Sequence, residues 1–132
     1  MPLKLKDISS YLSFAKKLSN TSEEILKKTP SNRIKINFKS DKSPVTKIDM
    51  AIERKLRSMI NKRFPDHGIF GEEYKNKTNN SPFLWVIDPI DGTKNFINGN
   101  SNFGTLISLC IDYTPVIGII NCPEIKKTWI GI

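Results

Sequence analysis

Two aspartates three positions apart, Asp88 and Asp91, are the residues of this chain best suited to chemistry. They follow an apolar run of strand length, residues 84–87, and a Gly-Thr dipeptide that can open a helix comes directly after them. Pro89 between them cannot continue a sheet ladder, so we expect the backbone to turn there and both carboxylates to face one point. This pattern predicts a site for a divalent metal ion and a phosphate group.

An oxygen-only ligand set can be assembled around these two carboxylates. Glu72 adds a third carboxylate, and the carbonyl of Ile90, exposed by the turn at Pro89, adds a neutral oxygen. Mg²⁺ takes oxygen ligands and is usually held by one or two carboxylates together with water and substrate phosphate. No histidine or thiolate lies nearby in the sequence to select zinc. The bland alternative for Glu72 is a solvated loop residue, because it is one of a pair of adjacent glutamates.

Gly92 and Thr93 are the predicted phosphate-binding residues. Gly92 lets the backbone approach a ligand closely, and two amides at a helix start form an anion cradle. With two metal ions roughly 3.5 to 4 Å apart, the expected reaction is hydrolysis of a phosphate monoester by a metal-activated water. The Thr93 hydroxyl is suited to orient that water. Asp49 is the candidate partner that fixes the direction in which the hydroxyl hydrogen of Thr93 points. Alternatively, Asp49 only caps a helix that begins near Thr46 and complements its dipole.

The first half of the chain predicts two helices with a strand between them. A capping-box pattern at 21–24 starts either a second helix or the last turns of one continuous helix that reaches about Lys28. Residues 33–39 alternate as a half-exposed strand should, and a second amphipathic pattern runs from Thr46 to Phe64. The apolar positions that recur at three- and four-residue steps in the first helix, from about residue 4 onward, are Leu5, Ile8, Leu12, Ala15 and Leu18.

The second half of the chain predicts a sheet. Residues 112–115 read as a hairpin turn, and residues 75–81 form a polar linker. The last strand-like run starts at Lys127 and reaches the end of the chain, which leaves an open sheet edge. The strand-like segments are the apolar runs at 68–71, 84–87, 105–111, 116–120 and 127–132. The fold class is therefore α/β, in the form of an α+β layered sandwich of helices on a mixed or antiparallel sheet.

The composition indicates which class of binding partner and which cellular compartment to expect for this protein. Lys+Arg 21 against Asp+Glu 13 gives 21 − 13 = +8, but the lysines are scattered among acidic neighbours, without the interleaved aromatic residues of a nucleic-acid platform. Small anionic substrates are favoured over nucleic acid or a membrane. Cys110 and Cys122 are not in a CxxC spacing, and no signal peptide or long apolar span is present, which predicts two free thiols in a cytoplasmic protein. His67 is predicted to be a plain loop histidine.

Three sequence elements resemble those of the inositol monophosphatase family in their order and approximate spacing. The third element is long and highly specific, and together the three cover most of residues 39 to 123. The elements are Ser43-Pro44-Val45-Thr46-Lys47-Ile48-Asp49, Gly71-Glu72-Glu73, and Trp85-Val86-Ile87-Asp88-Pro89-Ile90-Asp91-Gly92-Thr93-Lys94-Asn95-Phe96. The continuation looks more like the histidinol-phosphate phosphatase branch, through Phe103-Gly104-Thr105-Leu106-Ile107-Ser108-Leu109, Pro115-Val116-Ile117-Gly118 and Pro123.

This resemblance implies a role for each site residue. The implied metal ligands are Glu72, Asp88, the Ile90 carbonyl and Asp91. The implied phosphate and substrate contacts are Lys39, which precedes the first element, together with Asp91, Gly92 and Thr93. The implied catalytic residues are the Thr93-Asp49 pair, which acts on the nucleophilic water, and Glu72, which helps to activate that water through a metal. Ile48 and Ser101 depart from the pattern of the branch, which suggests local adjustment.

The resemblance also implies an incomplete enzyme. The family fold is a layered sandwich of alternating helices and sheets, usually a homodimer, which needs two or three Mg²⁺ ions per complete site and is inhibited by lithium. Residues 1–132 would be its N-terminal metal- and phosphate-binding portion. The second half of the family, with one more aspartate ligand in a Trp-Asp element and most of the substrate-selecting residues, is not encoded in this sequence. A C-terminal half or a second copy of the chain is therefore an expected partner.

The expected activity is Mg²⁺-dependent hydrolysis of a small polyol or amino-alcohol phosphate. Histidinol phosphate and inositol monophosphate are the leading substrates. A 3'-nucleotide or sugar bisphosphatase is the rival within the superfamily. The rival from another class is a truncated or split, non-catalytic remnant that needs a C-terminal partner.

Overall fold

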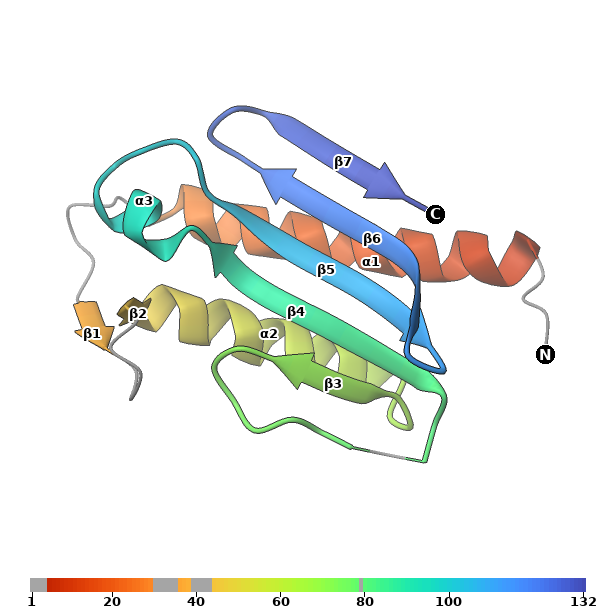
Figure 1. The fold of residues 1–132 in the computed structure, drawn as a ribbon. Coiled ribbons are helices and arrows are strands. Elements are labelled where there is room, and N and C mark those ends of the chain that lie inside the picture. Colours follow the sequence, from red (N-terminus) through yellow and green to blue (C-terminus); the bar gives the residue numbers. More distant parts are fainter. Residues whose placement is uncertain (1–4, 30–35, 39–43, 79) are drawn as a thin grey trace.

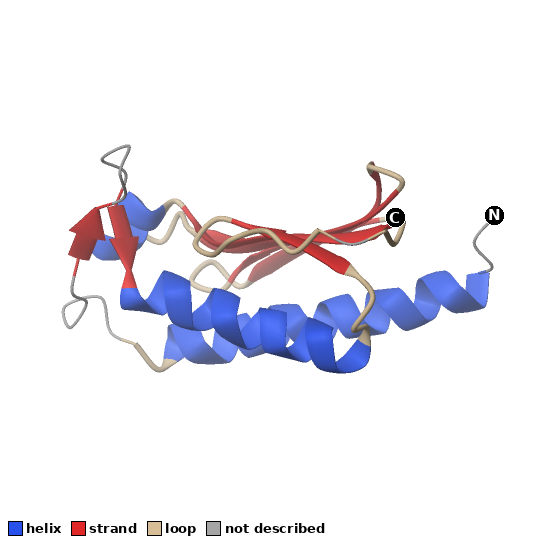
Figure 2. Cartoon of the chain, turned by 90° about the horizontal axis from the view of Figure 1, so that it is seen from below, coloured by secondary structure: helices blue, strands red, loops and turns tan. Residues whose placement is uncertain are grey.

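The computed structural model describes residues 5–29, 36–38, 44–78 and 80–132, which form two layers (Figure 1 and Figure 2). One layer holds the long helices α1 (Leu5–Lys27) and α2 (Lys47–Arg63), which run in opposite directions under a five-stranded sheet. The strands of the sheet are β3 (Gly68–Gly71), β4 (Phe83–Asp91), β5 (Gly104–Ile111), β6 (Thr114–Cys122) and β7 (Lys127–Gly131), in that spatial order. The short helix α3 (Thr93–Ile97) follows β4, and β1 (Ile36–Phe38) pairs with β2 (Pro44–Thr46) ahead of α2.

The sheet is mixed. Strands β3 and β4 pair in parallel, and every later neighbour pairs antiparallel. The predicted α+β class, with helices layered on a mixed sheet, is therefore confirmed.

Helix α1 is continuous over 23 residues, which decides between the two alternatives at residues 21–24. The Thr21 hydroxyl donates to the Lys17 carbonyl four residues earlier, as it does inside a helix rather than at a cap. Ser22 is fully buried, and its hydroxyl contacts the Thr105 hydroxyl of β5. The side chains that resembled a capping box therefore serve the helix interior and the contact with the sheet.

The predictions for the following segment agree with the structure where it is described. Helix α2 lies close to the predicted span, with Ile52, Leu56 and Ile60 buried on the predicted apolar face. Of the strand predicted at 33–39, residues 36–38 form β1, and the others lie outside the described residues.

The ladder is interrupted at Pro89, as predicted, but strand β4 continues to Asp91, so the expected turn is a bend inside the strand. Asp88 pairs with Leu106 and Asp91 with Gly104, which leaves two residues of β4 opposite the single residue Thr105. This is a β-bulge, a position where a strand can bend without losing its neighbour and where proline is tolerated. The backbone is redirected within the strand, and no loop is needed.

The hairpin predicted at 112–115 is present with a shorter turn. Asp112 and Tyr113 have φ angles of 50° and 64°, and Ile111 pairs directly with Thr114. Two consecutive residues with positive φ match the right-handed twist of the strands that they join. Strand β6 therefore begins at Thr114, two residues before the predicted apolar run.

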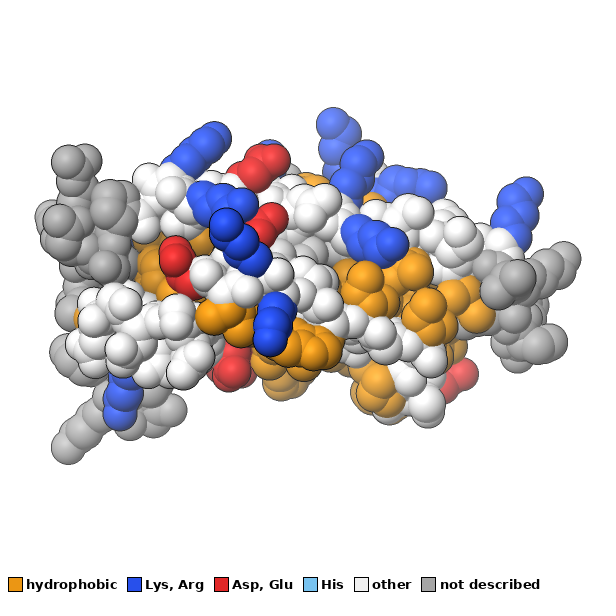
Figure 3. Space-filling model, turned by 90° about the horizontal axis from the view of Figure 1, so that it is seen from above, with side chains coloured by type: hydrophobic (Ala, Val, Ile, Leu, Met, Phe, Trp, Pro, Cys, Tyr) orange, Lys and Arg blue, Asp and Glu red, His pale blue; other side chains and the backbone are white. Residues whose placement is uncertain are grey.

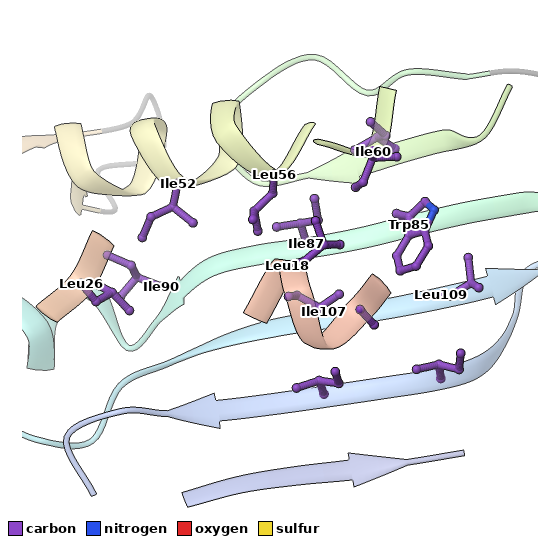
Figure 4. Close-up of a cluster of buried hydrophobic side chains, with 14 of the residues drawn as sticks. Leu18, Leu26, Ile52, Leu56, Ile60, Trp85, Ile87, Ile90, Ile107 and Leu109 are labelled. Atoms are coloured by element: carbon purple, nitrogen blue, oxygen red, sulfur yellow. The ribbon is translucent and has the colours of Figure 1, made fainter. Parts of the chain in front are cut away.

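The core lies between the helices and one face of the sheet (Figure 4). Alternate residues of the strands point toward the helices, because successive side chains of a strand face opposite sides. The buried side chains of this interface include Leu18, Ile52, Leu56, Ile60, Trp85, Ile87, Ile107, Leu109, Ile117 and Ile119. Their burial makes the helix pair and the sheet one packing unit.

His67 lies in the turn between α2 and β3, as predicted, but its side chain is buried against the core rather than exposed. Its ring stacks between Phe64 and Phe83, with ring-centroid distances of 4.5 and 4.6 Å. The Trp85 indole N–H donates to His67 Nδ1 over 3.0 Å. Burial and the nearby Lys77 charge lower the His67 pKa to about 4, against a smaller opposing effect of Asp66. The side chain is therefore a neutral hydrogen-bond acceptor at neutral pH.

The other face of the sheet is not covered by a helix. Phe70, Ile120 and Trp129 come from the strand positions that point away from α1 and α2, and they are 48%, 44% and 49% exposed. Seen from the β7 edge in Figure 3, hydrophobic side chains form patches along the sheet, and lysine and arginine side chains gather toward the helical side. The predicted open edge is β7, all of whose residues are exposed.

Two smaller predictions can be compared with the described residues. Cys110 is buried and Cys122 half-buried, and both are free thiols, as expected. No helix in the described ranges has the length and apolar character needed to cross a bilayer.

Candidate active site

Parallel pairing brings the segments that carry Glu72 and Asp88 to the same edge of the sheet. Gly71, the last residue of β3, is in register with Ile87 of β4, so Glu72 directly follows β3 at the level where β4 reaches Asp88. The carboxyl ends of parallel strands meet at one edge of a sheet, which is the usual position of ligand sites in such sheets. In Figure 1, β3 and β4 both point toward the end of the molecule where α3 and the start of α2 lie.

The β4 bulge separates the predicted ligands Asp88 and Asp91 and contains the third, Ile90. Asp91 is exposed at the end of the strand, and Asp88 is half-buried. The Thr105 hydroxyl donates to the Pro89 carbonyl over 2.8 Å and also contacts Ser22 of α1, so the bulge is tied to the helix layer through buried groups. The side chain of Ile90 is buried, which anchors the segment between the two aspartates.

Thr93 and Asp49, the predicted catalytic pair, come together across the helix starts. Asp49 lies in the first turn of α2, is only 1% exposed, and has its Oδ1 3.4 Å from the Thr93 hydroxyl. The same hydroxyl lies 3.0 Å from the Ile90 carbonyl, which is the shorter contact. A single hydroxyl proton can be directed at only one of these acceptors at a time.

Gly92 is required by the backbone at the junction of β4 and α3. It has φ of 85°, in the left-handed region, and a Cβ at this position would lie 2.8 Å from the Asn102 carbonyl oxygen. Asn95 donates its side-chain amide to that same carbonyl over 2.8 Å. The chain after α3 therefore folds back against Gly92, and a larger residue would displace it.

The loop after β3 is held by two side chains of α2 that the sequence did not single out. Glu53 is fully buried; its Oε1 accepts the Glu73 amide over 2.8 Å and its Oε2 accepts the Tyr74 amide over 3.0 Å. Arg57 donates to Glu53 and to the carbonyls of Tyr74 and Lys75. The only sequence signal was a Glu-Arg pair four residues apart, which on most helices is a solvated surface pair.

The donor atoms at this end of the sheet suit a hard cation. Glu72 and Asp91 are exposed and Asp88 is half-buried, so each can reach a ligand from solvent, and all supply oxygen. His67 is engaged in the aromatic core. Within the described ranges, no three Asp, Glu, His or Cys side chains are grouped closely enough to hold a metal ion. Lys39, the remaining predicted contact, lies outside the described residues.

Comparison with known proteins gives one consistent result. A model of the inositol monophosphatase family matches residues 7–132. The chain is similar to the bifunctional phosphatase IMPL2, chloroplastic, of Arabidopsis thaliana, with 38% identity over 99% of this chain and 39% of the relative. It is similar to a histidinol-phosphatase of Mycobacterium tuberculosis, with 36% identity over 73% of this chain and 37% of the relative.

A solved structure, the IMPase of Thermotoga maritima, superposes on the described fold. It has a TM-score of 0.83 and 31% identity, and the match covers 92% of this chain and 48% of that structure. The chain therefore spans no more than about half the length of the proteins that it matches.

Proposed function

Because the chain belongs to the inositol monophosphatase family, we propose that residues 1–132 are the N-terminal metal- and phosphate-binding portion of a Mg²⁺-dependent phosphomonoesterase. The observation that supports this proposal is the parallel pairing of β3 with β4, in which Gly71 and Ile87, the residues just before Glu72 and Asp88, are in register. The bulge then brings Asp91 to the same end of the sheet, next to the Thr93-Asp49 contact.

The residues that would hold Mg²⁺ are Glu72, Asp88, Asp91 and the carbonyl of Ile90. When bound, the cation would offset the charge of the phosphate oxygens and lower the pKa of a coordinated water. Gly92 leaves room for a close approach of the phosphate to the backbone at the start of α3. These assignments suit an oxygen-rich site with the substrate phosphate beside it.

Thr93 and Asp49 would direct the attacking water. When the Thr93 hydroxyl donates to Asp49, its oxygen lone pairs are free to accept a hydrogen bond from that water and so to orient it. The buried Asp49 carboxylate has the charge to hold the hydroxyl in this orientation. The contact of 3.4 Å is long, and it would have to tighten at the expense of the 3.0 Å contact with Ile90 when substrate binds.

The substrate proposed for this site is a small amino-alcohol or polyol phosphate. Histidinol phosphate is the first choice, because the similar protein from Mycobacterium tuberculosis is named a histidinol-phosphatase. Inositol monophosphate is the second choice, because the superposed Thermotoga maritima structure is named an IMPase.

Activity is proposed to need a complementary C-terminal half. The chain covers 37–48% of the three proteins compared above, and the sheet face opposite the helices carries exposed Phe70, Ile120 and Trp129. Burying such an apolar face is favourable by roughly 25 cal/mol per Å² of apolar surface. We assign this face to the complementary half, and a second copy of the chain is the alternative occupant.

An assay of phosphate release tests both proposals. The 132-residue chain would be incubated with Mg²⁺ and histidinol phosphate, inositol monophosphate, a 3'-phosphonucleotide or fructose bisphosphate. Each reaction would be run alone and with the part of the Mycobacterium tuberculosis relative that this chain does not match. Hydrolysis of one of the first two substrates, at least 100-fold faster in the complemented reaction, is the expected result. Full activity of the chain alone would refute the need for a second half, and no activity in any mixture would support a non-catalytic remnant.

A further inference from the structure

The loop that carries Glu72 is fixed by a buried carboxylate of α2, Glu53, which is not one of the proposed metal ligands. Glu53 is 0% exposed, and it accepts the amides of the two residues that directly follow Glu72. A buried charge is retained only where hydrogen bonds and an opposite charge offset its desolvation. Here two amides and the Arg57 guanidinium, whose Nε lies 2.9 Å from Glu53 Oε2, supply both.

Arg57 also binds this loop, and we call Glu53 and Arg57 together the clamp. Its two terminal nitrogens donate to the Lys75 and Tyr74 carbonyls over 2.9 and 3.1 Å. Glu53 therefore accepts hydrogen bonds from amide groups of the loop, and Arg57 donates hydrogen bonds to carbonyl groups of the same short segment. The peptide groups that follow Glu72 are held to one helix by charged partners, which make stronger hydrogen bonds than neutral ones.

Two further contacts close the loop on itself. The Asn76 side chain accepts the Gly71 amide over 3.2 Å, and Lys77 pairs with Ile69 through two backbone hydrogen bonds. The segment that the sequence suggested was a polar linker thus begins as a pinned loop. A Cβ on Gly71 would lie 2.6 Å from the Glu53 carboxylate, so glycine at 71 is the residue that lets this carboxylate reach the loop.

We propose that Glu53, together with Arg57, is a positioning residue that holds the Glu72 carboxylate at the end of β3 next to Asp88. The proposal rests on the proposed function, because it takes Glu72 to be a metal ligand. Glu53 touches neither metal nor substrate in this assignment. Its role is to fix the backbone that presents Glu72, as partners of metal ligands commonly do at a cost of 10–100-fold in affinity when removed.

Two substitutions with matched controls test the clamp. Glu53→Gln keeps the side-chain shape but loses the charge and one acceptor, and Glu24→Gln on the exposed surface of α1 is its control. Arg57→Gln is the milder second variant, and its control is Arg54→Gln on the exposed side of the same helix. If Glu53→Gln does not fold, Arg57→Gln still decides the question, because Arg57 is not fully buried.

The first measurement is amide hydrogen exchange of the 132-residue chain without metal. The Glu73 and Tyr74 amides are expected to exchange at least 10-fold faster in Glu53→Gln than in the wild type, while core amides of β4 such as Ile87 change much less. The second measurement is a Mg²⁺ titration followed by the amide shifts of Glu72 and Asp91. About a 10-fold weaker affinity is expected in the Glu53 and Arg57 variants, and no change is expected in the two controls.

The outcomes separate this inference from the proposed function. Unchanged exchange at Glu73 and Tyr74 together with unchanged Mg²⁺ affinity would overturn the positioning role and leave the phosphatase proposal standing. No Mg²⁺-dependent shift in the wild type would overturn the ligand assignment, and with it the link between the clamp and a metal. Faster exchange with unchanged Mg²⁺ affinity would show that the clamp is purely structural, which also overturns the proposal.

Discussion

Asp88 is the last paired residue of β4 before the bulge. Its neighbours Trp85 and Ile87 point into the core, and its own side chain lies on the opposite face of the sheet. The aspartate can therefore change its charge without changing the packing beneath it. This makes it the cleanest position at which to separate ligand chemistry from folding.

Asp88→Asn is expected to weaken Mg²⁺ binding strongly while leaving the fold nearly intact, because it keeps the shape and removes the ligand charge. Calorimetric titration with Mg²⁺ would measure the affinity, and thermal unfolding would measure stability, with a loss of more than 10-fold in affinity expected. Asp112→Asn in the exposed β5–β6 turn is the control. An unchanged affinity in Asp88→Asn would show that the ligand assignment is wrong.

His67 gives stability a pH dependence of defined sign. Its pKa is about 4 in the folded chain and about 6.5 when unfolded. The unfolded chain therefore binds more protons between these values, so the free energy of unfolding falls as the pH falls from 6.5 to 4 and is fully retained above 6.5. The shift corresponds to a loss on the order of 3 kcal/mol. Protonation at Nδ1 would also set an N–H against the Trp85 indole N–H.

Urea unfolding at a series of pH values between 7 and 4 checks this expectation. His67→Phe keeps an aromatic ring between Phe64 and Phe83 and cannot titrate. It should be less stable at pH 7, because the Trp85 N–H loses its acceptor, but its stability should change less over this pH range. The same slope in both proteins would assign the pH dependence to other groups.

At the scale of elements, the bulge of β4 depends on helix α1. Thr105 sits opposite the bulge, donates to the Pro89 carbonyl and contacts the buried Ser22 of α1. Asn121 of β6 makes a second buried link by donating to Ser19 of α1 over 3.0 Å. Helix α1 therefore does more than cover the sheet, since its serines accept and donate hydrogen bonds where the strands need them.

Thr105→Val is expected to destabilise the chain by about 1–3 kcal/mol, because it keeps the side-chain shape and leaves the buried Pro89 carbonyl and Ser22 hydroxyl without this partner. Urea denaturation of Thr105→Val and of the control Thr105→Ser, which keeps the hydroxyl, would measure the difference. If both variants are equally stable, the hydroxyl network does not support the bulge. The double variant Ser22→Ala/Thr105→Val should be less costly than the sum of the single changes.

At the scale of the whole molecule, the two faces of the sheet differ in how far they are buried. One face is packed on the helices, and the other presents large apolar side chains to solvent. The two tryptophans of the chain report on these faces separately, because Trp85 is 0% exposed and Trp129 is 49% exposed. On the exposed face, Ile120 and Trp129 are direct cross-strand neighbours, and exposed large apolar side chains that lie together mark an interaction surface.

We expect the complementary half to bury Trp129 and leave Trp85 unchanged. With 5-fluorotryptophan incorporated into the 132-residue chain only, ¹⁹F NMR should show one resonance that moves on addition of the complementary half and one that does not. Trp129→Phe identifies the resonance that moves. Restored phosphatase activity without a change at Trp129 would place the second half elsewhere, and a concentration-dependent shift without the second half would favour a second copy of the chain.

The amino-acid sequence by itself determined the elements and the candidate residues. Helical periodicity placed α1 and α2, apolar runs placed the strands, and carboxylates with a Gly-Thr turn marked Asp88, Asp91 and Thr93. These are local signals, because side-chain spacing and turn chemistry depend on neighbouring residues along the chain. The continuous helix at 21–24 and the unbroken strand at Pro89 could not be decided locally, since contacts with Thr105 are involved in both.

Only the tertiary structure decided which residues meet. The β3–β4 register aligns Gly71 with Ile87, the residues just before Glu72 and Asp88, and α2 brings Asp49 to Thr93 across 44 positions of sequence. The tertiary structure also gives two side chains a role that the sequence did not indicate. His67 is a buried hydrogen-bond acceptor, and Glu53 is a buried carboxylate that holds the loop after β3. Such partners follow from how layers pack, which a pattern of spacing along one chain does not contain.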